Sequence, residues 1–133
     1  MRNRCILVVD DDDFVRAFIR RVLQSEHFAV IDFADPVEAL EALPSFSHEL
    51  AAIITDFTMP HINGINFARK LANKLPHIPI LMISGSNEGP IEDSGLCFLG
   101  KPFGPRTLVQ ALRGLINASR QLVPEPAALT SIS

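Results

Sequence analysis

The sequence has no tryptophan and no tyrosine, and cysteine occurs only twice in 133 residues. Cys5 and Cys97 lie in separate apolar runs and not in a CxxC or Cys/His cluster. This placement predicts two buried free thiols in a reducing compartment. The four histidines share no metal-ligand spacing, so a soft metal site is disfavoured as well.

The sequence also lacks a long apolar run and a basic stripe. No run approaches the roughly 20 residues that a bilayer-spanning helix needs. The longest, Cys5 to Val9, is followed by four aspartates, which is unlike a signal peptide. The net charge is −3, and lysine and arginine do not cluster, so direct binding to nucleic acid is not expected. We therefore expect a soluble cytoplasmic protein without a membrane or nucleic-acid partner.

Strand-like and helix-like segments alternate along the sequence. Short apolar runs that end in polar loops occur at residues 5–9, 28–34, 51–55, 78–83 and 96–99. Between them, apolar residues recur at helical spacing, and the length fits one domain. This order predicts an α/β fold, a doubly wound five-stranded parallel sheet with helices on both faces and right-handed crossovers.

The expected helices have local start and stop signals. Asp35-Pro36 predicts an N-cap followed by a first-turn proline. Further helices are expected over about residues 63–74 and after Pro105. The segment 87–95 holds two glycines, one proline and one apolar residue, so the fourth helix should be shortened or missing. The first helix should follow Asp12-Asp13 and bury one apolar face, formed by Phe14, Val15, Phe18, Ile19, Val22 and Leu23.

Asp56 is the residue around which the chain is organised. It directly follows the apolar run 51–55, and Met59-Pro60 comes next, so its carboxylate should lie where a buried strand opens into a loop. Asp10-Asp11, Ser84 and Lys101 follow other predicted strands. The carboxyl ends of parallel strands share one edge of a sheet, and therefore these side chains should converge.

The expected cluster favours a particular chemistry. Three carboxylates in one crevice repel each other, and Lys101 alone cannot neutralise them, so a hard divalent cation such as Mg²⁺ is expected. A carboxylate beside Mg²⁺ and an ammonium can attack a phosphoryl group and form an acyl phosphate. The metal, Lys101 and the Ser84 hydroxyl could each contact one phosphoryl oxygen. No phosphate-cradling glycine loop or GxSxG elbow occurs, so the protein should receive phosphoryl groups and not bind nucleotide.

These residues resemble the receiver domains of two-component response regulators, over roughly residues 4–117. Each motif alone is weak, but four in order at strand ends are specific. The resemblance rests on Val8-Val9-Asp10-Asp11, Ile54-Thr55-Asp56 with Met59-Pro60 and Gly64, Ile83-Ser84-Gly85, and Lys101-Pro102-Phe103. It implies a flavodoxin-like strand order of 2-1-3-4-5.

The resemblance also implies roles for individual residues. Asp56 would accept a phosphoryl group from a histidine kinase or phosphotransfer domain. Asp11, Asp56 and the Thr58 carbonyl would hold Mg²⁺, with Asp10 helping through water. Lys101 would pair with the acceptor, and the Lys101-Pro102 peptide bond would be cis. Ser84 and Phe98 match the switch pair of the family.

The sequence departs from the family pattern at two kinds of position. Phe98 replaces a frequent tyrosine, so any switch would be steric and would offer no hydroxyl to a partner. Thr58 and Ser86 stand where the family tunes dephosphorylation, and neither is an acid or amide. We therefore expect a long-lived acyl phosphate.

The domain is expected to span residues 1–120, with 121–133 as a flexible tail rich in proline, alanine, serine and threonine. The tail is too short for an effector domain. The chain is thus either a stand-alone receiver or part of a longer protein such as a hybrid kinase. Its downstream protein partner is unknown.

Two other functions compete with this interpretation. A pseudo-receiver would keep the site as a binding module without being phosphorylated. A phosphatase with an aspartate nucleophile would need a second aspartate two residues later, and Thr58 stands there instead. We prefer a phosphoryl acceptor that assists its own phosphorylation, and not an enzyme, and we keep the pseudo-receiver as the alternative.

Overall fold

A five-stranded parallel sheet forms the centre of the computed structural model, which describes residues 4–59, 62–85 and 97–122. The spatial order is β2-β1-β3-β6-β7, so the sheet strands lie in the chain order 2-1-3-4-5 that was predicted. All four pairings between neighbours are parallel. The strands are β1 (Cys5–Val9), β2 (Ala29–Phe33), β3 (Leu50–Asp56), β6 (Ile80–Ser84) and β7 (Cys97–Gly100).

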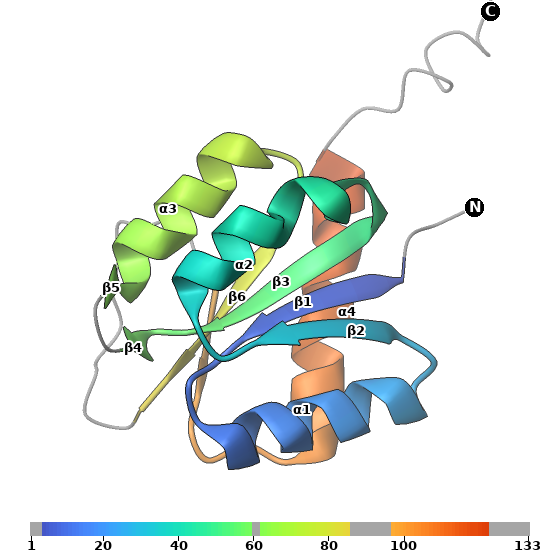
Figure 1. The fold of residues 1–133 in the computed structure, drawn as a ribbon. Coiled ribbons are helices and arrows are strands. Elements are labelled where there is room, and N and C mark those ends of the chain that lie inside the picture. Colours follow the sequence, from blue (N-terminus) through green and yellow to red (C-terminus); the bar gives the residue numbers. More distant parts are fainter. Residues whose placement is uncertain (1–3, 60–61, 86–96, 123–133) are drawn as a thin grey trace, which may run out of the picture.

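The described helices cover both faces of this sheet (Figure 1). They are α1 (Asp13–Ser25), α2 (Pro36–Ala42), α3 (Gly64–Lys74) and α4 (Pro105–Leu122), with 3₁₀ turns at Leu43–Ser45 and Ser47–Glu49. Two apolar clusters join the layers. On one face Ala39, Leu43, Phe67 and Leu71 pack against the sheet, and on the other Ile19, Leu23, Leu108 and Leu112 do so. The central strands are therefore buried from both sides, as a doubly wound sheet requires.

The helix starts follow local chemistry. The Asp12 side chain accepts from the backbone N–H groups of Phe14 and Val15 and caps α1. Asp35 caps α2 through Val37, with Pro36 in the first turn as predicted. Asn63 caps α3 in the same way. These caps satisfy N–H groups that the first helical turn leaves without partners.

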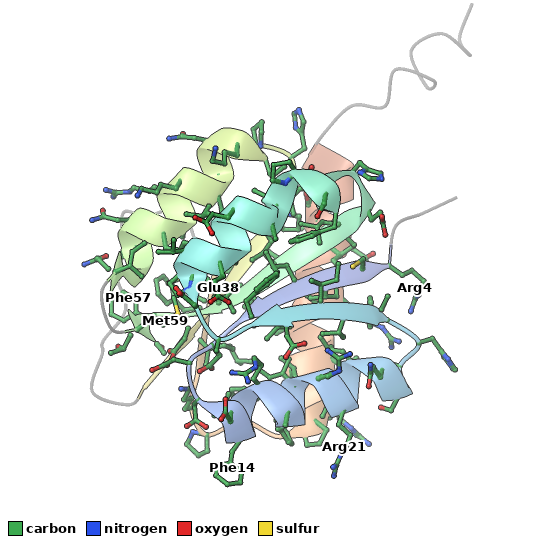
Figure 2. All side chains as sticks on the ribbon, in the orientation of Figure 1. Arg4, Phe14, Arg21, Glu38, Phe57 and Met59 are labelled. Carbon is green, nitrogen blue, oxygen red and sulfur yellow. The ribbon has the colours of Figure 1, made fainter. Side chains whose placement is uncertain are left out.

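Three expectations were wrong at the surface. Phe14 is 89% exposed and Phe18 36% exposed, so only Ile19, Val22 and Leu23 of the predicted α1 face are buried. Cys97 is a free thiol, as is Cys5, but it is exposed because β7 lies at the edge of the sheet. In Figure 2 the Phe14 side chain points away from the body of the molecule.

Some boundaries also differ from the sequence expectation. A two-stranded antiparallel pair, β4 (Thr58–Met59) with β5 (Ile62–Asn63), occupies a segment that was expected to be irregular. Helix α4 continues through residues 121 and 122, into the expected tail. The expected shortening of the fourth helix and the rest of the tail lie outside the described residues. Within the described part of the chain, no helix is long and apolar enough to span a bilayer.

Candidate functional site

The predicted acids, Ser84 and Lys101 lie at the last residue of a strand or just after it, at the same edge of the sheet. The register places Thr55 opposite Val9, so Asp56 and Asp10 leave neighbouring strands side by side. Asp56 lies opposite Ile83, and Ser84 lies opposite Gly100, which precedes Lys101. The parallel register therefore brings four distant segments to one place.

Three carboxylates form the centre of this place. Oxygens of Asp10, Asp11 and Asp56 all lie within 4.8 Å of one another. Asp10 and Asp56 are 1% and 5% exposed, whereas Asp11 is exposed. Like charges at this spacing are costly in a buried setting, and the cost falls when a cation joins them.

Asp10 shows that cost most clearly. One carboxylate oxygen, Oδ1, accepts a hydrogen bond from the backbone N–H of Asp12 at 2.8 Å. The other, Oδ2, is buried and has no hydrogen-bond partner among the described residues. Burial, helped by the charges of Asp56 and Asp11, raises the pKa of Asp10 to about 6, although the Asp12 N–H and Lys101 act in the opposite direction.

Asp56 has polar contacts on both carboxylate oxygens. Its Oδ2 lies 3.7 Å from Nζ of Lys101, and its Oδ1 accepts from the backbone N–H of Thr58 at 3.3 Å. Lys101 thus supplies one positive charge to the cluster of three carboxylates. The loop after β3 is held by the Phe57 N–H, which donates to the Ile83 carbonyl at 2.8 Å.

The predicted switch and cis-peptide residues lie around the acceptor. Ser84 is buried, and its carbonyl accepts from the backbone N–H of Lys101 at 2.8 Å. The Lys101-Pro102 peptide bond is cis. Phe98 is partly buried, and its ring meets the ring of Phe57 edge-on, with centroids 6.1 Å apart. Phe98 therefore packs against the residue that directly follows Asp56.

Gly64 fixes how closely helix α3 approaches the site. A Cβ added at Gly64 would lie 2.1 Å from the carbonyl oxygen of Phe57. Only glycine permits this contact, because real Cβ atoms do not come so close to backbone. The sequence motif contained this glycine, and the structure gives its reason.

The site fits a hard divalent cation. Its ligand set is oxygen only, two of the three carboxylates are buried, and the orphaned Oδ2 of Asp10 calls for a cation or a bound water. Neither histidine nor cysteine belongs to the cluster in the described part of the chain, which disfavours soft metals.

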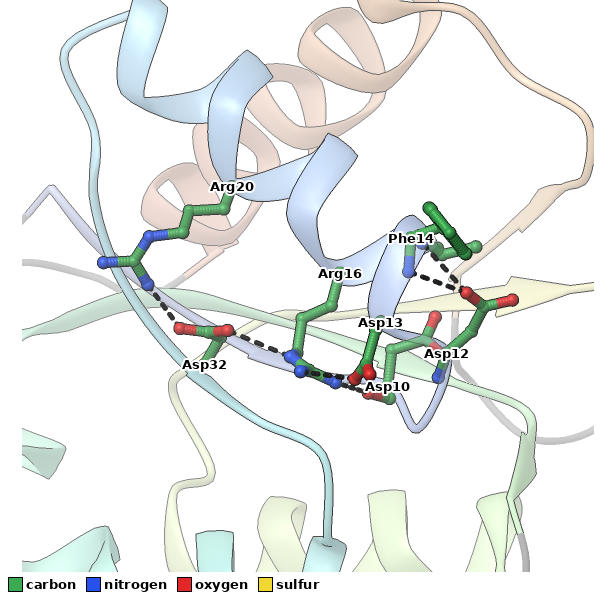
Figure 3. Close-up of polar contacts among 8 residues, drawn as sticks. Asp10, Asp12, Asp13, Phe14, Arg16, Arg20 and Asp32 are labelled. Carbon is green, nitrogen blue, oxygen red and sulfur yellow. Dashed lines mark hydrogen bonds and ion pairs between the residues drawn. The ribbon is translucent and has the colours of Figure 1, made fainter.

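A charged network that was not predicted from the sequence lies beside the acids. Arg16 and Arg20 of α1 both pair with Asp32 near the end of β2 (Figure 3). Arg16 also contacts Asp13 and the Asp10 carbonyl. The i, i+4 spacing of the two arginines and the acid in the next strand were the available signal.

Comparisons with known proteins give a family and related structures. Residues 6–113 match the response regulator receiver domain family. The alkaline phosphatase synthesis transcriptional regulatory protein SphR of Synechococcus elongatus is 34% identical over 93% of this chain, which covers 53% of SphR. The sensor kinase CckA of Brucella abortus is 31% identical over 84% of the chain, which covers 12% of CckA. The chain thus spans about half or less of these relatives.

Solved structures show the same fold. The chemotaxis response regulator CheY4 of Vibrio cholerae superposes with a TM-score of 0.73 at 28% identity, covering 85% of this chain and 98% of CheY4. A response regulator receiver domain protein from Clostridium thermocellum has a TM-score of 0.79 at 24% identity, covering 90% and 98% of the two chains. At that identity the second similarity supports the fold alone.

Proposed function

The chain belongs to the response regulator receiver domain family, whose members accept phosphoryl groups in two-component systems, and we propose that Asp56 is the acceptor. One observation carries this proposal. The nearly buried Asp56 carboxylate lies within 4.8 Å of two other acids while Lys101 approaches it to 3.7 Å. This arrangement supports a nucleophile with a cation site and an ammonium group beside it.

The proposed reaction starts from a phosphohistidine on a histidine kinase or phosphotransfer domain. A carboxylate oxygen of Asp56 attacks phosphorus, the P–O bond of an acyl phosphate forms, and the P–N bond breaks. The leaving imidazole nitrogen keeps the electron pair of the P–N bond and takes a proton from solvent water. Catalysis would consist of positioning and of neutralising charge on the phosphoryl oxygens, and we assign these roles to Lys101 and the Ser84 hydroxyl.

The proposed cofactor is Mg²⁺. Asp11, Asp56 and the Thr58 carbonyl would hold it, with Asp10 acting through water, and it would offset negative charge on the incoming phosphoryl group. The Thr58 backbone is already held at Asp56 by its N–H. Asp10 is suited to an indirect role, because one of its oxygens already accepts from Asp12.

The proposed output is a change of protein-interaction surface. A phosphoryl group on Asp56 would attract the Ser84 hydroxyl, and the space released would let Phe98 change its packing against Phe57. The partner downstream is a protein of unknown identity.

We assign the receiver to residues 1–120 and place it in the cytoplasm, where phosphohistidine donors occur.

Phosphoryl uptake tests the proposal directly. The protein is incubated with Mg²⁺ and phosphoramidate, whose P–N bond resembles that of phosphohistidine, and its intact mass is measured. Wild type should gain one phosphoryl group, and Asp56→Asn should gain none, because an amide is not a nucleophile here. Asp35→Asn is a matched control, since asparagine still caps α2 and the site keeps its acids.

The contrary results point to different conclusions. Uptake by Asp56→Asn equal to wild type would remove Asp56 from the role of acceptor. A folded wild type that binds Mg²⁺ but never gains the group would favour the phosphorylation-independent pseudo-receiver. Turnover of a phosphomonoester would revive the phosphatase reading.

A further inference from the structure

Arg16 joins two acid-bearing segments beside the site, the turn after β1 and the end of β2. Its Nη1 donates to the Asp10 carbonyl at 2.8 Å, its Nη2 to the Asp13 carboxylate at 2.7 Å, and its Nε to Asp32 at 3.0 Å. Figure 3 shows this guanidinium between the end of β2 and the turn that carries the acids. Each of the three guanidinium nitrogens of Arg16 therefore donates a hydrogen bond.

The turn from Asp10 to Asp13 is fixed from both sides by these contacts. On the inner side, the Asp10 carboxylate accepts from the Asp12 N–H. On the outer side, Arg16 holds the carbonyl of Asp10 and the side chain of Asp13. The Arg16 side chain is only 18% exposed, and its hydrogen bonds and charge pairing with Asp13 and Asp32 outweigh desolvation and raise the pKa of Arg16. It is thus a fixed, permanently charged part of the fold.

We propose that Arg16 is a positioning residue, which sets the geometry in which Asp10 and Asp11 meet a divalent cation at the receiver site. This inference rests on the proposed function, because it takes the acid cluster as a metal site. In the turn that carries the acids, Arg16 contacts the carbonyl of Asp10 and the carboxylate of Asp13. It acts through the backbone of Asp10 and so determines where the carboxylates of that turn lie.

The sign of its effect separates positioning from simple electrostatics. A guanidinium near the acid cluster repels a second cation, so removing its charge alone would strengthen Mg²⁺ binding. Loss of a positioning contact has the opposite effect, and removing outer-shell partners commonly weakens metal affinity about 10–100-fold. If Mg²⁺ binds more weakly after the Arg16 charge is removed, Arg16 acts by positioning the acids and not through its charge.

The substitution Arg16→Lys separates a positional role of Arg16 from an electrostatic one in a second way. Arg16→Lys keeps the charge but replaces a planar fork by a single ammonium, which cannot reproduce three contacts in three directions. If position is what matters, Arg16→Lys should bind Mg²⁺ about as poorly as Arg16→Gln. If charge is what matters, Arg16→Lys should behave as wild type.

The test is a Mg²⁺ titration followed by amide chemical shifts at constant ionic strength, with thermal unfolding recorded for each variant. We expect Arg16→Gln and Arg16→Lys to bind at least about 10-fold more weakly than wild type. Arg20→Gln is the matched control, because it removes an arginine that pairs with Asp32 and leaves the Asp10 and Asp13 contacts of Arg16 in place. It should bind as wild type or slightly more tightly.

The outcomes are distinguishable. Folded Arg16 variants that match or exceed wild-type affinity overturn the inference and leave the proposed function standing. If Arg16→Gln does not fold, Arg16→Lys decides, since it keeps the aliphatic stem and the charge. A folded wild type without Mg²⁺ affinity overturns the metal site and this inference together.

Discussion

At the scale of single residues, Asp10 makes folding depend on pH. Its pKa is raised from 3.8 to about 6 in the folded protein, so between these values the folded state holds a proton that the unfolded chain has released. The free energy of unfolding therefore falls as pH rises from about 4 to about 6, and is constant above that. The loss is at most about 3 kcal/mol, since each pKa unit is worth about 1.4 kcal/mol, and solvent screening reduces it.

Asp10→Asn isolates this contribution from those of other groups. Asparagine carries no charge at any of these pH values, so the variant should not share the loss. The difference in unfolding free energy, variant minus wild type, should grow from pH 4 to pH 6.5 and then level off. Urea titrations with chelator present, followed by circular dichroism, measure it, and a difference that is constant across this range would contradict the assignment.

At the scale of elements, Gly64 connects helix α3 to the acceptor loop. An added Cβ would meet three backbone atoms of Phe57 at 2.1–2.8 Å, and backbone cannot move aside as a side chain can. Gly64→Ala should destabilise the fold by about 1–3 kcal/mol, as overpacked sites do. It should also slow phosphoryl uptake, because the loop that moves carries the Thr58 N–H to Asp56.

Gly114→Ala is a control that should change the stability of the fold in the opposite direction. It lies in α4, is exposed, and an added Cβ there meets nothing within 4 Å. Gly114→Ala should stabilise the fold by about 0.5–1 kcal/mol, because alanine costs less backbone entropy in a helix. Thermal unfolding and phosphorylation rates of both variants test the pair. Equal stability of Gly64→Ala and wild type would show that the two elements can separate without cost.

The elements also show what a sequence can and cannot predict. The caps by Asp12 and Asp35 were predictable because their chemistry lies within three or four residues. The exposure of Phe14 and Cys97 was not, because periodicity identifies an apolar face but not which turn of a helix another element covers. The β4–β5 pair and the Arg16–Asp32 contact are likewise tertiary, and each joins segments whose approach only the folded chain determines.

At the scale of the whole molecule, convergence of the site was predictable from topology alone. Every strand of a parallel sheet ends at the same edge, and thus Asp10, Asp56, Ser84 and Lys101 had to approach each other. Distances were beyond reach of the sequence, and they decide the chemistry. The 3.7 Å distance between Lys101 Nζ and Asp56 Oδ2, and the buried Asp10 oxygen without a hydrogen-bond partner among the described residues, depend on the folded chain.

The same arrangement couples cation binding to global stability. A cation that binds only the folded state stabilises it by mass action, about 2.7 kcal/mol at a free concentration 100 times Kd. Mg²⁺ should therefore raise the unfolding temperature of wild type beyond the effect of NaCl at equal ionic strength, which corrects for screening. Circular dichroism is the suitable probe, because the chain has neither tryptophan nor tyrosine.

Asp11→Asn and Asp12→Asn identify the acids responsible. Asp11 is an exposed member of the 4.8 Å cluster, so its replacement should change metal-free stability little but abolish most of the Mg²⁺-dependent gain. Asp12→Asn removes one charge from the same turn, outside the cluster, and asparagine still caps α1. It should keep the gain. Equal gains in the two variants would mean that Asp11 does not contribute to the binding of Mg²⁺ at the cluster of Asp10, Asp11 and Asp56.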